Sequence, residues 1–100
     1  MKIKNSFPDI AYHGTNMLFL DSIKEQGLIS HIPNNVHITS EISVAKRYAE
    51  RHENPLLLKI DCEKMIKDGY VFYEHPAKHT ALLNNIPFQY IKIIQGGTKQ

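Results

Sequence analysis

The apolar run at residues 56–60, Leu-Leu-Leu-Lys-Ile, constrains the fold of this chain more than any other segment. It is apolar at nearly every position, and Pro55 and Asp61 bound it. A strand with apolar side chains on both of its faces must be covered on both faces. We therefore expect these residues to form a central, buried strand.

The remaining segments follow an order typical of an α+β domain. Further strands are predicted at residues 10–12, 36–39, 70–73, 81–83 and 88–94. Helices are predicted after residue 16, after residue 40 and, as a short turn, at residues 61–65. The later strands have no crossover helices between them, which excludes a doubly wound fold.

Capping residues set the ends of the predicted helices. Thr15 or Asn16 caps the first helix, and Gly27 ends it as a left-handed residue just past the last turn. Ser40 is expected to cap the second helix. Residues 28–35 between them are expected to form a loop, because Pro-Asn-Asn favours a turn.

Apolar side chains recur at helical spacing in both longer helices. They are Met17, Leu20 and Ile23 in the first, and Ile42, Ala45 and either Tyr48 or Ala49 in the second. Asp61 is expected to cap the third helix, and the Asp-Gly pair at residues 68–69 marks a turn.

Composition narrows the class of protein. One hundred residues form one domain, for which we expect an N-terminal extension at 1–7, a single domain at 8–95 and a flexible tail at 96–100. A net charge of +2 neither requires nor excludes nucleic acid. The lone Cys62, the lack of a long apolar run and the lack of a signal peptide together predict a cytoplasmic protein.

Two histidines lie at strand ends. His13 follows the strand at residues 10–12 and precedes Gly14 and Thr15, whereas His37 lies in the strand that runs into the second helix. This pattern predicts a pocket around a polar ligand. The structural alternatives are a histidine that bonds a backbone group beside a turn glycine, and a half-buried histidine between two core-facing neighbours.

In order and spacing, these motifs resemble the ADP-ribosyltransferase lobe of the RNA 2′-phosphotransferases, which use NAD to remove a splice-junction 2′-phosphate from tRNA. Tyr-His-Gly-Thr at 12–15 matches the first NAD-binding motif, and residues 36–39 match the second histidine strand. Arg-His at 51–52 matches the end of the following helix. Residues 55–73 match the central block, and residues 86–91 match the last strand.

The resemblance implies a small ADP-ribosyltransferase-like fold, with mixed, mostly antiparallel sheets and two or three short helices. It implies attack of an RNA 2′-phosphate on the ribose anomeric carbon of NAD, with release of nicotinamide. The catalytic residues that it implies are His13, His37 and Arg51. The NAD-binding residues that it implies are His13, Gly14, Thr15, Gly27, His37 and Thr39.

The implied roles follow from side-chain chemistry. His13 would hydrogen-bond the ribose hydroxyls, and Gly14 would let its backbone approach the nicotinamide carboxamide. Arg51 would grip phosphate with two parallel hydrogen bonds, or else lie in solvent near the helix C-terminus. His52 could act as an acid, a base or a phosphate contact, and Glu74 could be a glutamate that activates the acceptor, but we expect both to be solvated.

The chain departs from the family in features that concern RNA. Family members carry an amino-terminal RNA-binding lobe that supplies an Arg-His pair and a further arginine, and we expect all three to be missing. Pro33 and Asn35 stand where the family often has arginine and histidine. Two other functions therefore stay open: a stand-alone ADP-ribosyltransferase, of toxin or phage-conflict type, with another nucleic-acid or protein acceptor, and an inactive module that binds NAD or ADP-ribose.

Two further chemistries are not expected. His75 and His79 have the spacing of metal ligands on a helix, but Pro76 lies between them and no third ligand is evident. Cys62 has no evident activating partner, so we do not expect a nucleophilic cysteine.

Overall fold

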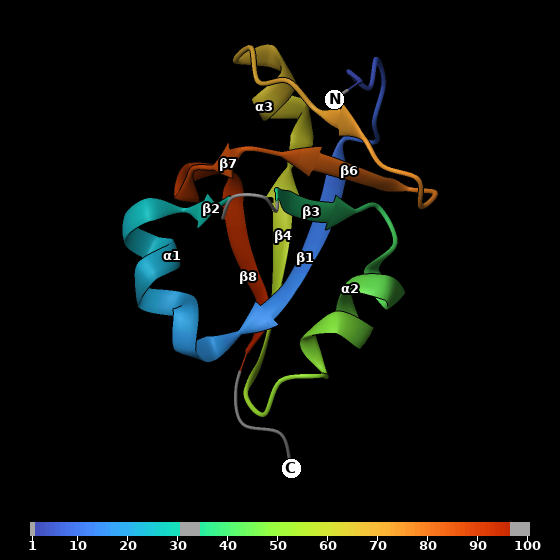
Figure 1. Ribbon diagram of the computed structural model, residues 1–100. Coiled ribbons are helices and arrows are strands. Elements are labelled where there is room, and N and C mark those ends of the chain that lie inside the picture. Colours follow the sequence, from blue (N-terminus) through green and yellow to red (C-terminus); the bar gives the residue numbers. More distant parts are fainter. Residues whose placement is uncertain (1, 31–34, 97–100) are drawn as a thin grey trace.

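A computed structural model describes residues 2–30 and 35–96 of the chain (Figure 1). The described strands form a six-stranded sheet, in the order β5-β6-β3-β1-β4-β8, and a two-stranded sheet of β2 and β7. All of these pairs are antiparallel. The strands are β1 (Ile10–Asn16), β2 (Leu28–Ile29), β3 (Val36–Thr39), β4 (Pro55–Asp61), β5 (Tyr73–Glu74), β6 (Thr80–Leu83), β7 (Asn85–Ile86) and β8 (Ile91–Gly96).

Strand β4 is the buried strand that the apolar run predicted. Leu56, Leu58 and Ile60 are completely buried, and Leu57 is 2% exposed, so both faces of the strand are covered. β4 lies between β1 and β8 and pairs with β1 along its whole length, from Ile10 opposite Asp61 to Asn16 opposite Pro55. The α+β class is confirmed.

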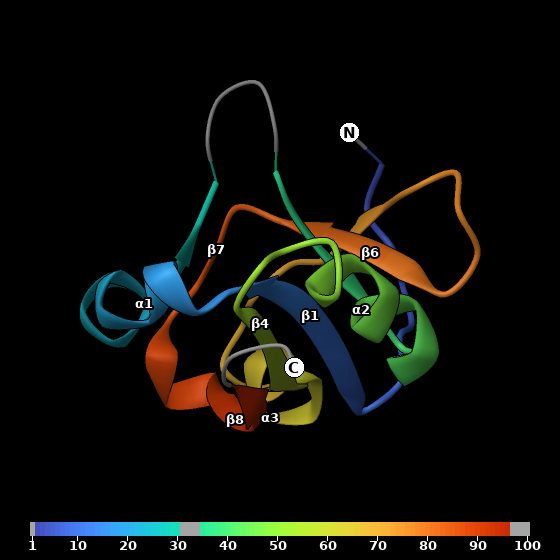
Figure 2. The same cartoon turned by 90° about the horizontal axis from the view of Figure 1, so that it is seen from below.

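Three α-helices and two 3-10 helices complete the described fold. They are η1 (Met17–Phe19), α1 (Leu20–Gln26), α2 (Ile42–Ala49), α3 (Cys62–Lys67) and η2 (Phe88–Tyr90). α1 and α2 lie on opposite sides of β1 (Figures 1 and 2), and α2 packs directly on that strand. The site described below lies between these two helices.

The first helical segment begins and ends as its capping residues predicted. Asn16, rather than Thr15, caps it, because the Leu18 N–H donates to Asn16 Oδ1 at 3.0 Å. Gly27 has a φ of 76° and ends α1. Asp61 caps α3 by accepting a hydrogen bond from the Lys64 N–H, and that helix runs to Lys67, two residues further than expected.

The expectation that Ser40 caps the second helix was wrong. α2 begins at Ile42, and the hydroxyl that bonds its entry is that of Thr39, which accepts from the Glu41 N–H at 3.1 Å. Ser40 lies one residue too early to bond the first turn, and its hydroxyl is directed toward the His79 carbonyl, 3.5 Å away. On this helix Ala45 and Ala49 are buried, whereas Ile42 and Tyr48 are exposed.

Several strand boundaries also differ from the expectation. Leu28–Ile29, expected to be a loop, pairs with β7, a contact far along the chain that no local pattern encodes. Tyr70 is not in a strand, because its N–H bonds back to Met65 O at the end of α3, and β5 begins at Tyr73. Residues 88–90 form η2, a turn closed by the Tyr90 N–H, which donates to the Pro87 carbonyl at 3.1 Å.

The first residues of the chain lie against β5. Ile3 forms a bridge with Tyr73, and the Lys4 N–H donates to Phe72 O at 2.8 Å. Phe7 packs against the core and its ring contacts that of Phe72. Of the expected tail, residue 96 ends β8, and residues 97–100 lie outside the described residues, as does Pro33.

Candidate functional site

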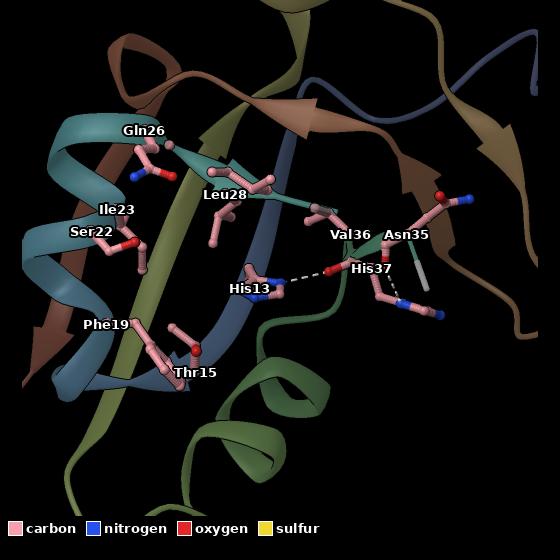
Figure 3. Close-up of a pocket in the computed structure, with 12 residues that line it drawn as sticks. His13, Thr15, Phe19, Ser22, Ile23, Gln26, Leu28, Asn35, Val36 and His37 are labelled. Carbon is pink, nitrogen blue, oxygen red and sulfur yellow. Dashed lines mark hydrogen bonds between the residues drawn. The ribbon is translucent and has the colours of Figure 1, made fainter. Parts of the chain in front are cut away.

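The site lies where β1 and β3 diverge. Among the described residues, β1 pairs with β3 at one position, where Tyr12 lies opposite Thr39. By contrast, seven residues of β1 pair with β4. Beyond Tyr12 the gap between the strands is bridged by a side chain. His13 Nδ1 lies 2.6 Å from the backbone oxygen of His37 (Figure 3).

This hydrogen bond fixes the tautomer of His13. A carbonyl oxygen only accepts hydrogen bonds, so Nδ1 must carry the proton that is donated to His37. Burial lowers the pKa of the His13 ring, and its bond to the His37 backbone offsets this only in part. At neutral pH the ring is therefore uncharged, and its Nε2 holds a lone pair that can accept a hydrogen bond.

His37 is more exposed and is held by its own neighbours. Its Nδ1 lies 3.0 Å from the Asn35 carbonyl, to which it donates. Its ring meets the His75 ring edge to face, with 5.0 Å between ring centroids. The loop between β5 and β6, which carries His75, therefore lies directly beside the β1–β3 gap.

Two cavities meet at these histidines, and His13 and His37 line both. The smaller cavity, of about 420 Å³, lies between β1 and α1 (Figure 3). None of its described lining residues is acidic, lysine or arginine. Its wall is made largely of apolar side chains, with a few polar groups among them: Phe19, Ile23, Leu28, Val36, Ser22 and Gln26.

The larger cavity, of about 670 Å³, opens toward α2 and the β5–β6 loop. Much of its wall is apolar, and there is no carboxylate among its described lining residues. Basic side chains stand among the apolar ones: besides His13 and His37 they are Arg51, His52, His75 and Lys78. The Arg51 guanidinium carbon lies 4.7 Å from the centroid of the Tyr48 ring, a contact that orients the cation. This cavity is suited to an anion.

The catalytic and NAD-binding residues predicted from the sequence all line one or both of these cavities. Thr15 and Gly27 line the smaller cavity, Gly14, Thr39 and Arg51 line the larger one, and the two histidines line both. Such pockets, with an apolar wall and a few convergent polar groups, are the usual form of a small-molecule site.

Close packing also explains why glycine occupies positions 14 and 27. A Cβ at Gly14 would lie 2.1 Å from the Ala45 carbonyl oxygen and 2.6 Å from the Ala49 nitrogen, so glycine lets α2 rest directly on β1. The structural alternative for this motif was wrong in part: Gly14 lies inside β1 and not in a turn. Its other part holds, because His13 does bond a backbone group, the His37 carbonyl. Gly27 combines a positive φ with a would-be Cβ only 2.1 Å from the Ile86 carbonyl oxygen.

Comparison with known proteins identifies the family of this chain. The model of the RNA 2′-phosphotransferase, Tpt1 / KptA family matches residues 1–80. The chain belongs to this family. The resemblance drawn from the sequence motifs is therefore confirmed.

Individual relatives agree with the family match. A probable RNA 2′-phosphotransferase of Pseudomonas fluorescens is 33% identical over 87 residues, which cover 87% of this chain and 47% of the relative. One from Fusobacterium nucleatum is 38% identical over 86 residues, covering 85% of this chain and 48% of the relative. The chain thus spans about half the length of the curated relatives that it matches.

Some lining residues of this RNA 2′-phosphotransferase family member were missed by the sequence argument. Lys78 carries no local signal, because only the packing of its loop beside β3 brings it to the larger cavity. Tyr48 could have been found from its spacing of three residues from Arg51, which suits a helical side-chain contact. His52, expected in solvent, is half-buried and lines the same cavity.

Other candidates are set apart from the site. His79 Nε2 lies 3.5 Å from a Glu41 carboxylate oxygen, and the described residues contain no group of three or more metal-ligating side chains. Burial raises the pKa of the Cys62 thiol to about 12, so it is no nucleophile. Glu74 is exposed and lines neither cavity.

Within the described chain, no helix is long and apolar enough to cross a membrane.

Proposed function

We propose that this chain transfers an RNA 2′-phosphate to the ADP-ribose portion of NAD and releases nicotinamide. The observation that carries the proposal is the junction at His13 and His37. There, a cavity with no lysine, arginine or acidic residue among its described lining residues meets a cavity to which Arg51 and Lys78 bring positive charge and no described lining residue brings a carboxylate. Family membership supports the same reaction.

The two cavities fit the chemistry of NAD. Ligand pockets commonly enclose roughly 300–1,000 Å³, and both cavities fall in that range. A base of NAD suits the apolar wall of the smaller cavity, and the phosphate of the RNA acceptor suits Arg51 in the larger one. NAD brings an electrophilic anomeric carbon with nicotinamide as its leaving group.

His13 is suited to the ribose between the two parts. Its Nε2 lone pair accepts a hydrogen bond from a ribose hydroxyl, while its Nδ1 proton is held by His37. Because burial keeps the ring uncharged, it adds no positive charge beside a transition state that resembles an oxocarbenium ion. His37, which lines both cavities, limits how the ribose can turn.

Attack in the first step needs no base, since a phosphate is already anionic. A bond forms between a 2′-phosphate oxygen and the anomeric carbon, and the carbon–nitrogen bond breaks with its electron pair on nicotinamide. Arg51, oriented by Tyr48, holds the phosphate with two parallel hydrogen bonds.

In the second step, the adjacent ribose hydroxyl attacks phosphorus. The bond from phosphorus to the RNA 2′-oxygen breaks, and a cyclic ADP-ribose phosphate leaves. His13 Nε2 takes the proton of the attacking hydroxyl and then gives it to the leaving RNA 2′-oxygen, which becomes a hydroxyl while the ring returns to its uncharged form. Proton balance is thus kept within the site.

The other proposed contacts to NAD are secondary. Thr15 offers a hydroxyl in the smaller cavity, and Thr39 offers one in the larger cavity while it accepts from Glu41 N–H. Gly14 and Gly27 offer backbone alone at the walls.

Mass spectrometry of the products tests this function. The protein is incubated with NAD and a short RNA that carries an internal 2′-phosphate, beside a His13→Ala variant. We expect dephosphorylated RNA and free nicotinamide with the natural protein, and neither with the variant. Nicotinamide release with the phosphate retained indicates another acceptor, and NAD-dependent thermal stabilisation without turnover indicates a binding module.

A further inference from the structure

We propose that the loop between β5 and β6, residues 75–79, completes the acceptor-phosphate subsite, with Lys78 and His75 as its phosphate-binding side chains. The inference rests on the proposed function and names residues that neither the motifs nor the family match single out. Arg51 lies just past α2 and Lys78 lies in the loop, so two elements bring a cation each to one cavity.

The protonation pattern of His75 suits an anion. The Ala77 N–H donates to His75 Nδ1 at 3.0 Å, so that nitrogen is unprotonated and accepts. In the uncharged ring the proton is then on Nε2, which makes that nitrogen a donor. His75 lines the larger cavity and its ring contacts the His37 ring, so the His75 side chain lies next to the junction.

The loop is held in place by hydrogen bonds and an ion pair that do not involve the Lys78 ammonium. The Ser40 N–H donates to the His79 carbonyl at 2.9 Å, and His79 Nε2 lies 3.5 Å from Glu41 Oε1. The Thr80 hydroxyl bonds the Lys78 carbonyl at 3.3 Å. The backbone of the loop is thereby anchored to the entry of α2. Lys78 is exposed, and within residues 2–30 and 35–96 its ammonium forms no ion pair.

The charge of the cavity selects a class of ligand. Arg51 and Lys78 supply two permanent positive charges, and no carboxylate stands among the described lining residues. A phosphate monoester carries nearly two negative charges at neutral pH, whereas a backbone phosphodiester carries one. We infer that Lys78 favours a 2′-phosphate monoester over the phosphodiesters of the ordinary RNA backbone.

Binding of two matched RNAs tests the subsite without any need for turnover. The probes are one fluorescent trinucleotide with an internal 2′-phosphate and the same trinucleotide with a 2′-hydroxyl, measured by polarisation. Lys78→Gln should weaken binding of the phosphorylated probe roughly tenfold, the usual effect of losing one charge-assisted bond, and leave the other probe nearly unchanged. Lys78→Arg should restore most of the difference.

Lys67→Gln is the matched control, because Lys67 is an exposed lysine at the end of α3 and lines neither cavity. It should bind both probes as the natural protein does. The inference is overturned if the natural protein shows no preference for the 2′-phosphate, or if Lys78→Gln keeps that preference in full.

Kinetics separate this inference from the proposed function. If turnover occurs, Lys78→Gln should raise KM for the RNA and leave KM for NAD unchanged, whereas an equal rise in both overturns the subsite. If the natural protein releases no nicotinamide and yet prefers the phosphorylated probe through Lys78, the proposed function fails and the subsite stands.

Discussion

Gly14 makes the closest approach between α2 and the sheet, and Gly14→Ala should therefore be strongly destabilising. The added Cβ would lie 2.1 Å from the Ala45 oxygen and 2.6 Å from the Ala49 nitrogen. Both are backbone atoms of α2, so no flexible side chain can move aside. Relief requires the helix itself to retreat from β1.

The size of the effect follows from that retreat. Contacts of real Cβ atoms are essentially never shorter than 3.0 Å, so α2 must move by about 0.9 Å to relieve the Ala45 contact. A gap of that size forfeits up to about half of the dispersion energy of each contact between α2 and β1. We expect a loss of about 3 kcal/mol in the free energy of unfolding, at the upper end of overpacking effects.

Gly69→Ala is the matched comparison. Gly69 has a φ of +93°, and a Cβ there would meet nothing within 4 Å, so this variant carries backbone strain without a clash. It should cost about 1 kcal/mol. Gly14 has no positive φ, so its variant carries the clash alone.

Urea and thermal unfolding, followed by far-UV circular dichroism, measure both variants. Tryptophan fluorescence cannot serve, because the chain has no tryptophan. For Gly14→Ala we expect the Tm to fall by roughly 12–24 °C, since 1 kcal/mol shifts a domain of this size by about 4–8 °C. A Gly14→Ala variant that is as stable as Gly69→Ala, or more so, refutes the packing argument.

Three further variants or treatments test other parts of the account. Because burial lowers the pKa of His13, the unfolded chain binds protons more readily than the folded chain below about pH 6.5. The free energy of unfolding should therefore decrease as the pH is lowered below that value, by at most about 1.4 kcal/mol per pH unit. Urea unfolding at about pH 7.5 and about pH 5.5 measures this decrease, which should be smaller in His13→Gln than in the natural protein. Arg51→Lys keeps the charge and loses both the planar fork and the stacking on Tyr48, so kcat/KM for the phosphorylated RNA should fall roughly tenfold in steady-state assays, and an unchanged value argues against two-point phosphate binding. Cys62 is fully buried and its pKa is raised to about 12, so a thiol reagent at neutral pH should label it only after urea unfolds the protein; rapid labelling of the folded chain would show that α3 opens.

Local sequence signals predicted those parts of the fold that local chemistry determines. The unbroken apolar run of residues 56–60 has only one stable environment, a strand covered on both faces, and β4 is that strand. Asn16 and Gly27 act on backbone groups within a few residues of themselves, so their capping roles were visible in the sequence.

Features that depend on distant partners were not visible. Leu28–Ile29 is a strand because Asn85–Ile86 lies beside it, more than fifty residues further along. Ser40 has the chemistry of a cap, but the register of β3 gives the bond to Thr39 instead. Single-residue boundaries of this kind follow from the assembled sheet.

The candidate site divides in the same way. His13 and His37 were found because each belongs to a strand motif, and the structure joins them through one hydrogen bond. His13 lies inside β1 and not past its end, because pairing with β4 extends that strand to Asn16. Lys78 and His75 reach the same cavity only because β6 pairs with β3 and holds their loop there. The reason for Gly14 was also hidden, since it depends on where α2 comes to rest.

The central claim is that one site couples cleavage of NAD to removal of an RNA 2′-phosphate. The most direct test quantifies nicotinamide and dephosphorylated RNA in the same reaction by mass spectrometry, with the natural protein in catalytic amounts. We expect the two products to appear at equal rates, together with an equal amount of cyclic ADP-ribose phosphate. Nicotinamide formed without loss of the RNA phosphate, or no consumption of NAD at all, would contradict it.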